Sequence, residues 1–196
     1  MNINGVIKSN MKALIIIDMV NADVPKRKDK NKLISNQLKL IDAFKKKCFR
    51  IIFTKGKLGV KPNTVMDKLW GDEYAGKNKN KKKARKEFLW NISIIDELLK
   101  TKPNKIIFKE AYSAFYKTDL ERYCKKNKIN ELYFCGISSG CCVYFTAVDA
   151  AYRRIQPYLI KDASGSVSEK QHKINVNNFE TVIGPSLSTK EVLDRI

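Results

Sequence analysis

The feature that most constrains the fold is an alternation between short apolar runs and longer amphipathic segments. Six runs rich in β-branched or aromatic residues have the length and composition of β-strands. They are residues 13–17, 50–54, 105–108, 131–135, 157–160 and 181–183. Each run is apolar at consecutive positions, which is typical of strands buried on both faces of a sheet. We therefore expect a six-stranded sheet that is covered on both sides.

Helical patterns fill the intervals between these runs. The clearest spans residues 31–47, where apolar side chains recur on one stripe and lysines lie opposite. Further helices are expected at residues 118–127, 142–154, 168–177 and 188–196. Strands that alternate with helices predict a doubly wound, Rossmann-like α/β fold with a mostly parallel sheet and right-handed crossovers.

A single domain is expected for residues 1–196, because a chain of 22.5 kDa can bury one core without needing a second. Residues 1–10 are expected to form a loose N-terminal extension. Residues 55–85 contain glycines, many lysines and no clear period, so they are predicted to form a long irregular excursion. Loops of that length commonly cover a functional site or move.

Cysteine and histidine usage indicates the compartment and argues against a metal. The apolar run at residues 13–17 is too short for a membrane span or the core of a signal peptide. Five cysteines, an odd number, suit free thiols in the cytoplasm. The single histidine, His172, cannot complete a common zinc pattern. We therefore expect a cytoplasmic protein with no metal, no cofactor and no membrane partner.

The net charge of +19 raises nucleic acid as a partner, because basic surfaces release counterions from phosphates. The only concentrated basic run is KNKNKKKARK, residues 77–86, and no aromatic interleaving or known nucleic-acid module accompanies it. The main interpretation is a solvated loop, and contact with RNA or another anion is the alternative.

Reactive residues directly follow three of the predicted strands. Asp18 follows residues 13–17, Lys109 follows residues 105–108, and a turn containing Cys141 and Cys142 follows residues 131–135. Ligands of an open parallel sheet bind beyond the carboxyl ends of its strands. A carboxylate, an ammonium and a thiol are therefore expected at one edge.

These three groups could perform nucleophilic chemistry. A helix N-terminus and a nearby lysine both lower the pKa of a thiol, and a carboxylate can accept the thiol proton. Each residue also has a structural explanation: Asp18 as a turn cap, Lys109 as one of many surface lysines, and the cysteines as buried packing residues. Periodicity alone does not choose between Cys141 and Cys142.

Three segments together resemble the isochorismatase-like cysteine hydrolases, a family that contains nicotinamidases, N-carbamoylsarcosine amidases and isochorismatases. They are ALIIIDMVN at 13–21, KEAYSAFYKTDL at 109–120 and CGISSGCCVYFTAVDAAYRR at 135–154. The resemblance continues through LIKDASGS, residues 159–166, and the helix that holds His172. It covers most of the chain and implies a six-stranded sheet with helices on both faces.

The resemblance implies roles for individual residues. It places the catalytic aspartate at Asp18 and the catalytic lysine at Lys109, and the spacing to a Thr-Ala pair selects Cys142 as the nucleophile. It also implies a cis peptide between Ile137 and Ser138. The backbone N–H groups of Ser138 and Cys142 would then form an oxyanion hole.

The substrate pocket is where the chain departs from the family. The residues expected to line it are Asp23, Trp70, Tyr112 and Phe115. Core packing is the alternative for Tyr112 and Phe115. Nicotinamidases bind a metal through an aspartate and two histidines, which His172 alone cannot supply, so it is interpreted as a packing residue. Gly140 stands where the family commonly carries an acidic or amide side chain.

These observations predict a cysteine amidohydrolase that cleaves a small amide or carbamoyl substrate through a thioester. The resemblance further implies a homo-oligomer, either a dimer or a tetramer. One alternative is vinyl-ether hydrolysis of isochorismate, which needs no nucleophilic cysteine. Another is a binding module that keeps the fold and uses its basic surface for nucleic acid or an acidic protein.

Overall fold

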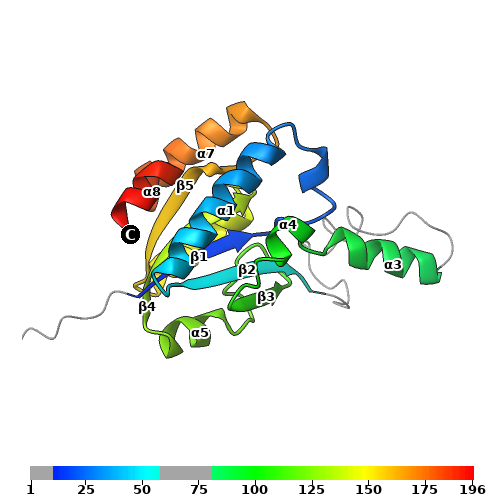
Figure 1. Ribbon diagram of the computed structural model, residues 1–196, viewed down its shortest axis with the longest axis horizontal. Helices are drawn as coiled ribbons and strands as arrows, with labels where there is room; N and C mark the ends of the chain where they lie inside the picture. Colours follow the sequence, from blue (N-terminus) through cyan, green and yellow to red (C-terminus); the bar gives the residue numbers. More distant parts are fainter. Residues whose placement is uncertain (1–10, 58–80) are drawn as a thin grey trace, which may run out of the picture.

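The computed structural model of the chain describes residues 11–57 and 81–196. The predicted N-terminal extension and Trp70 lie outside the described residues. Six strands form one parallel sheet in the order β3-β2-β1-β4-β5-β6 (Figure 1). Their bounds are β1 Met11–Ile17, β2 Arg50–Gly56, β3 Lys105–Lys109, β4 Ile129–Ile137, β5 Gln156–Gly165 and β6 Ser186–Leu187.

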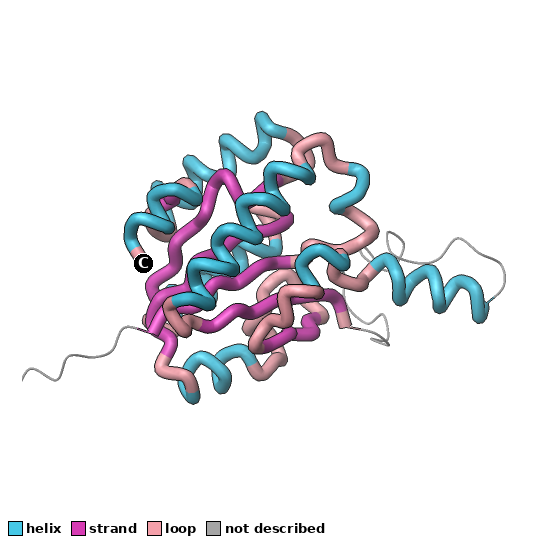
Figure 2. Tube along the Cα trace, in the orientation of Figure 1, coloured by secondary structure: helices cyan, strands magenta, loops and turns pink. Residues whose placement is uncertain are grey.

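Helices connect the strands and lie on both sides of the sheet (Figure 2). Their bounds are η1 Val24–Lys26, a 3-10 turn, and α1 Lys30–Lys46, α3 Lys81–Asn91, α4 Asp96–Leu99, α5 Leu120–Lys126, α6 Cys142–Tyr152, α7 Glu169–Val182 and α8 Thr189–Arg195. The doubly wound parallel α/β fold predicted from the alternating pattern is confirmed.

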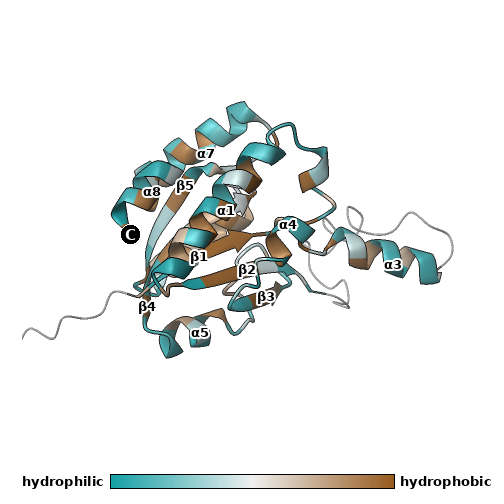
Figure 3. Cartoon of the chain, viewed as in Figure 1, coloured by the Kyte–Doolittle hydropathy of each residue, from teal (hydrophilic) through white to brown (hydrophobic). Residues whose placement is uncertain are grey.

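Two apolar cores lie on opposite faces of the sheet, because successive side chains of a strand point to opposite faces. Ala13, Ile15 and Ile17 of β1 pack in one core with residues of α5, α6 and α7. Leu14 and Ile16 pack in the other with residues of α1, α4 and α8. The hydropathy colouring shows this arrangement as apolar strands between helices of mixed character (Figure 3). Both faces of the sheet are therefore covered, as predicted.

Two predicted elements are wrong. Residues 181–183 do not form a strand, because Thr181 and Val182 end helix α7 and the sixth strand is the two-residue β6. The Ser168 side chain caps α7 and Phe179 is fully buried, so tertiary packing overrides the strand propensity of β-branched residues.

The second wrong element is the irregular excursion at its two ends, since residues 55–56 belong to β2 and residues 81–85 to helix α3, while residues 58–80 lie outside the described residues. Helix α3 begins at Lys81, inside the basic run, and extends away from the sheet (Figure 1). Lysine, arginine, alanine and glutamate are good helix formers, so this segment can be helical without an apolar stripe.

Candidate active site

The carboxyl ends of β1, β3 and β4 bring the three predicted reactive residues together. Asp18 directly follows β1 and has a φ of 49°, which turns the chain out of the strand. Lys109 is the last residue of β3, and Cys142 is the first residue of α6 after β4. Because parallel strands all end at one edge, these three residues meet there although they are distant in sequence.

The Lys109 ammonium joins the other two side chains. Its Nζ lies 2.7 Å from Asp18 Oδ2 and donates to Cys142 Sγ at 3.3 Å. It also donates to the Ala111 carbonyl at 3.2 Å. The Lys109 side chain is only 1% exposed, whereas that of Asp18 is 16% exposed. A buried cation therefore holds a thiol and a carboxylate at one point, with the carboxylate accessible from outside.

Thr54 holds the second oxygen of Asp18. Its hydroxyl donates to Asp18 Oδ1 at 2.6 Å and accepts from the Asp18 backbone N–H at 3.2 Å. Thr54 is fully buried in β2, between the strands that carry Asp18 and Lys109. Sequence reasoning missed this residue. The sequence signal that could have indicated Thr54 was its hydroxyl, which closes the mainly apolar run at residues 50–54.

The Cys142 thiol is protonated at rest, which corrects the expectation of a lowered pKa. Burial raises the pKa of Cys142 above its ordinary value, and the negative charge of Asp18 raises it further. Lys109 opposes this shift but does not outweigh it. For Lys109 itself, burial lowers the pKa, but Asp18 and Cys142 together leave it raised. The resting site therefore pairs a neutral thiol with an ammonium.

This protonation state predicts the pH dependence of alkylation. The rate of iodoacetamide modification at Cys142 should keep rising from about pH 7 to about pH 9, by about tenfold per unit, because only the thiolate reacts. Tandem mass spectrometry of the Cys142 peptide would measure the rate, in a Cys141→Ala background that leaves one thiol there. A rate that already levels off near neutral pH would contradict this protonation state.

The turn between β4 and α6 has the geometry that the resemblance implied. The Ile137–Ser138 peptide is cis, as expected. The Ser138 carbonyl accepts the N–H groups of Cys141 at 3.0 Å and Val143 at 3.2 Å, which ties the turn to the helix. The Cys142 N–H lies in the first turn of α6, where backbone donors have no acceptor within the helix. The assignment of an oxyanion hole to Ser138 and Cys142 stays a prediction.

Gly136 brings this turn close to Asp18. Its φ is 113°, and a Cβ placed on it would lie 2.1 Å from the Ile17 carbonyl oxygen. Only glycine therefore fits at this position. The close approach sets the end of β4 directly against the end of β1, where Asp18 begins.

The predicted pocket residues occupy different environments. Tyr112 is half-buried and stacks on Phe145, with ring centroids 5.6 Å apart and an interplanar angle of 11°. Phe115 is 4% exposed within the core, and the Arg153 guanidinium lies 4.8 Å from its centroid, which favours the packing alternative. Asp23 is half-buried and directly precedes η1. Their contact with substrate stays a prediction.

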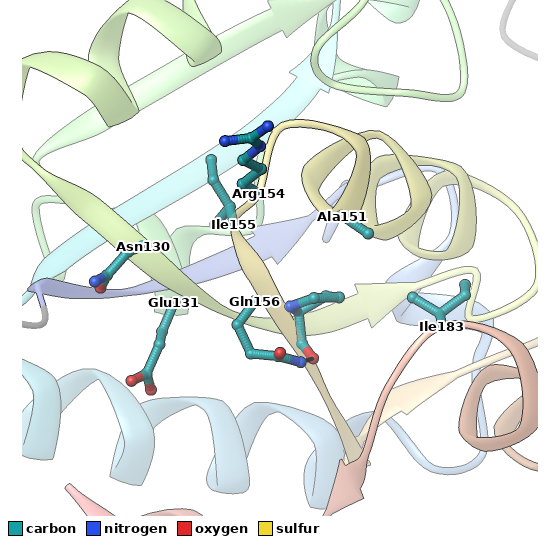
Figure 4. A pocket seen from close by; sticks show the side chains of 8 residues that line it. Asn130, Glu131, Ala151, Arg154, Ile155, Gln156 and Ile183 are labelled. Atoms are coloured by element: carbon teal, nitrogen blue, oxygen red, sulfur yellow. Dashed lines mark hydrogen bonds between the residues drawn. The ribbon is translucent and has the colours of Figure 1, made fainter.

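A separate cleft of about 430 Å³ lies at the amino ends of β4 and β5 (Figure 4). Its lining consists of Asn130, Glu131, Ala151, Arg154, Ile155, Gln156, Pro157 and Ile183. These residues lie at the opposite edge of the sheet from Asp18, Lys109 and Cys142, so the cleft is separate from that cluster.

Within residues 11–57 and 81–196, no group of three or more His, Cys, Asp or Glu side chains is placed to hold a metal ion. In the same part of the chain, no helix is long and apolar enough to cross a membrane. The cytoplasmic location and the homo-oligomeric state stay predictions.

The fold and the site define a doubly wound α/β protein with a thiol, a carboxylate and an ammonium at the carboxyl edge of its sheet. The chain belongs to the isochorismatase family: residues 12–191 match the model of the Isochorismatase domain. It is therefore an isochorismatase-family hydrolase. The chain is 27% identical over 190 residues to the uncharacterized isochorismatase family protein YwoC of Bacillus subtilis (strain 168), covering 94% of this chain and 93% of that protein.

Solved structures share the fold over nearly the whole chain. A cysteine hydrolase from Pseudomonas syringae pv. phaseolicola 1448A has a TM-score of 0.79 and 18% identity, covering 94% of this chain and 91% of that one. N-carbamoylsarcosine amidase from Thermoplasma acidophilum has a TM-score of 0.73 and 23% identity, covering 91% and 96%. Several other curated relatives match 41–52% of this chain and 35–49% of their own length.

Proposed function

We propose that this hydrolase is a cysteine amidohydrolase that cleaves a small amide or carbamoyl compound through a thioester on Cys142. The observation that carries the proposal is the position of Lys109 Nζ, 2.7 Å from Asp18 Oδ2 and 3.3 Å from Cys142 Sγ. A nucleophile, a proton acceptor and a cation that holds them together are the parts that such a reaction needs.

The reaction begins with proton transfer. Asp18 takes the proton of the neutral Cys142 thiol as the sulfur attacks the carbonyl carbon, so a free thiolate need not accumulate beforehand. The carbonyl electron pair moves onto oxygen, and the N–H groups of Ser138 and Cys142 stabilise the resulting oxyanion. Lys109 stabilises the negative charge as it develops on sulfur.

The tetrahedral intermediate then loses its nitrogen. Asp18 returns the proton to the leaving group, the C–N bond breaks, and ammonia or an amine departs while the acyl group stays on Cys142. A water molecule, deprotonated by the same Asp18, attacks the thioester carbon, the C–S bond breaks, and the acid is released. Asp18 then returns its proton to the Cys142 sulfur, which restores the resting site. The Thr54 hydroxyl holds Oδ1 of Asp18 throughout, which leaves Oδ2 to face the reacting groups.

Two further observations support this proposal over its alternatives. Vinyl-ether hydrolysis needs no nucleophilic thiol, whereas here Cys142 lies in contact with a buried ammonium. The fold is also similar to that of an N-carbamoylsarcosine amidase, although an identity of 23% does not assign a substrate.

The test is a panel of small primary amides and carbamoyl compounds incubated with the purified protein, with ammonia as the readout. We expect at least one compound to release ammonia, and rapid acid quenching should capture a thioester on the Cys142 peptide by mass spectrometry. Ammonia release with the acyl group on a different residue, or no release from any amide in the panel, would contradict the proposal.

A further inference from the structure

A partly buried polar network lies behind the turn that follows β4, and its centre is the histidine that was expected only to pack. His172, on α7, has hydrogen bonds at both ring nitrogens: Nδ1 lies 2.9 Å from Ser139 Oγ, and Nε2 lies 2.8 Å from the Lys161 carbonyl oxygen. Ser139 is fully buried and directly follows Ser138. The two hydrogen bonds tie the ring of His172 to the turn after β4 on one side and to β5 on the other.

The partners of His172 fix its tautomer. A carbonyl oxygen can only accept, so Nε2 carries the proton that is donated to Lys161. In the neutral ring Nδ1 is then an acceptor, and the Ser139 hydroxyl donates to it. His172 therefore sets the direction in which the Ser139 hydroxyl points.

Asn175, one helical turn after His172, completes the network. Its Nδ2 donates to Ser139 Oγ at 3.2 Å and to Ser166 Oγ at 3.2 Å. Gln171 Nε2 donates to its Oδ1 at 3.0 Å, which fixes the orientation of the amide. Ser166 Oγ in turn lies 3.1 Å from Ser138 Oγ. Side chains of α7 thus contact Ser139 directly and are linked to Ser138 through Ser166.

Gly140 makes room for this arrangement. A Cβ on Gly140 would lie 2.4 Å from Asn175 Nδ2 and 2.6 Å from its Cγ. The family commonly carries an acidic or amide side chain at this position. In this chain the amide comes instead from α7 and fills the space beside the turn.

The backbone secures the same segment from the other side. The Ser139 N–H donates to the Gly165 carbonyl at 2.8 Å, and Arg27 Nη1 donates to the Ser166 carbonyl at 2.7 Å. The first contact joins the turn after β4 to the end of β5, and the second joins the segment between η1 and α1 to the same end of β5. The Ile137–Ser138 peptide is therefore held between backbone contacts and the side chains of α7.

We propose that His172 is a positioning residue for the reaction. By orienting Ser139, and together with Asn175 and Ser166, it fixes the Ile137–Ser138 peptide so that the Ser138 N–H points at the developing oxyanion. This role rests on the proposed function, because it presupposes acyl transfer to Cys142. His172 itself touches no reacting atom.

The test uses p-nitrophenyl acetate, which needs no knowledge of the natural substrate. The Cys142 sulfur bonds to the acetyl carbon, the ester C–O bond breaks, nitrophenolate leaves with the electron pair, and Asp18 takes the thiol proton. Stopped-flow absorbance gives the rate of the nitrophenolate burst. His172→Gln keeps a donor to Lys161 but loses the acceptor for Ser139, so we expect a burst about tenfold slower. Ser139→Ala should slow it similarly.

Conservative rescue separates positioning from mere stability. His172→Asn places an amide oxygen near the position of Nδ1, so it should keep most of the burst rate although it loses the contact with Lys161. The double variant His172→Gln with Ser139→Ala should be no slower than either single variant, because both remove one shared hydrogen bond. Lys173→Gln, an exposed change on the same helix, serves as the matched control and should leave the rate unchanged.

The outcomes distinguish the two proposals. A burst that persists in Cys142→Ala would overturn the proposed function and this role together. A burst that depends on Cys142 but stays at the wild-type rate in folded His172→Gln would overturn the positioning role alone. The positioning role would also be overturned if His172→Asn and His172→Gln slowed the burst equally and the slowing followed the drop in melting temperature of each variant.

Discussion

Replacing Cys142 by alanine is expected to lower amide hydrolysis by about 10⁴-fold or more, because the proposed carrier of the acyl group is lost. The fold should survive the change. The side chain is small and lies at the start of α6, where Val143, Ala147 and Ala150 keep the helix packed against the core when the thiol is removed. Ammonia release at saturating substrate would measure the loss, and circular dichroism would confirm the helix content.

The adjacent cysteine provides the matched control. Burial also raises the pKa of the Cys141 thiol, and a hydrogen bond to Tyr112 opposes this shift. Cys141→Ala is the same chemical change one position away from Cys142. It leaves the contact between Lys109 and Cys142 in place. It should stay within a few-fold of wild type. If Cys141→Ala were the inactive variant instead, the assignment of the nucleophile would be wrong.

The meeting of Asp18, Lys109 and Cys142 could be predicted because it depends on topology rather than on side-chain detail. Each residue lies at the end of a strand, or in the turn beyond it, and hydrophobic pattern alone identifies those strands. A parallel sheet brings the ends of such strands to one edge. The choice between Cys141 and Cys142 needed motif spacing, because both thiols lie in the same turn. The structure places Cys142 against Lys109.

The protonation state of the thiol could not be predicted in the same way. A helix N-terminus and a lysine are visible in the sequence, whereas the burial that dominates the pKa of Cys142 is a property of the packed structure. Thr54 was missed for a related reason. A threonine in a strand is an ordinary β-former, and only the register between β1 and β2 places its hydroxyl against Asp18.

His172 shows how a residue can be placed correctly on an element while its hydrogen-bond partners stay unforeseen. Its helix was predicted, but its partner Ser139 is 33 positions away, on the far side of β5 in the chain. No local pattern marks such a contact. In the same region, residues 181–183 were read as a strand because a short β-branched run does not reveal whether a helix continues through it.

Replacing Lys109 by methionine is expected to lower amide hydrolysis by about 10³-fold, because the site loses the charge that we propose to stabilise the reacting sulfur. It should also destabilise the fold by about 2 kcal/mol, since Asp18 loses its ion pair. The usual cost of breaking a buried pair is reduced here because the Asp18 carboxylate is 16% exposed and keeps its hydrogen bond to Thr54. Urea denaturation would measure the change in unfolding free energy.

A double variant separates the catalytic use of this pair from its effect on stability. Asp18→Asn combined with Lys109→Met replaces both charges by neutral groups of similar size, so the unfolding free energy should return close to that of wild type. Activity should remain lost, because neither the proton acceptor nor the cation is restored. Lys57→Met, an exposed lysine beyond β2, is the matched control for removing one positive charge. A double variant that recovered activity along with stability would mean that the buried charges only support the fold. Stability without activity would mean that the chain keeps a buried ion pair for the reaction it performs.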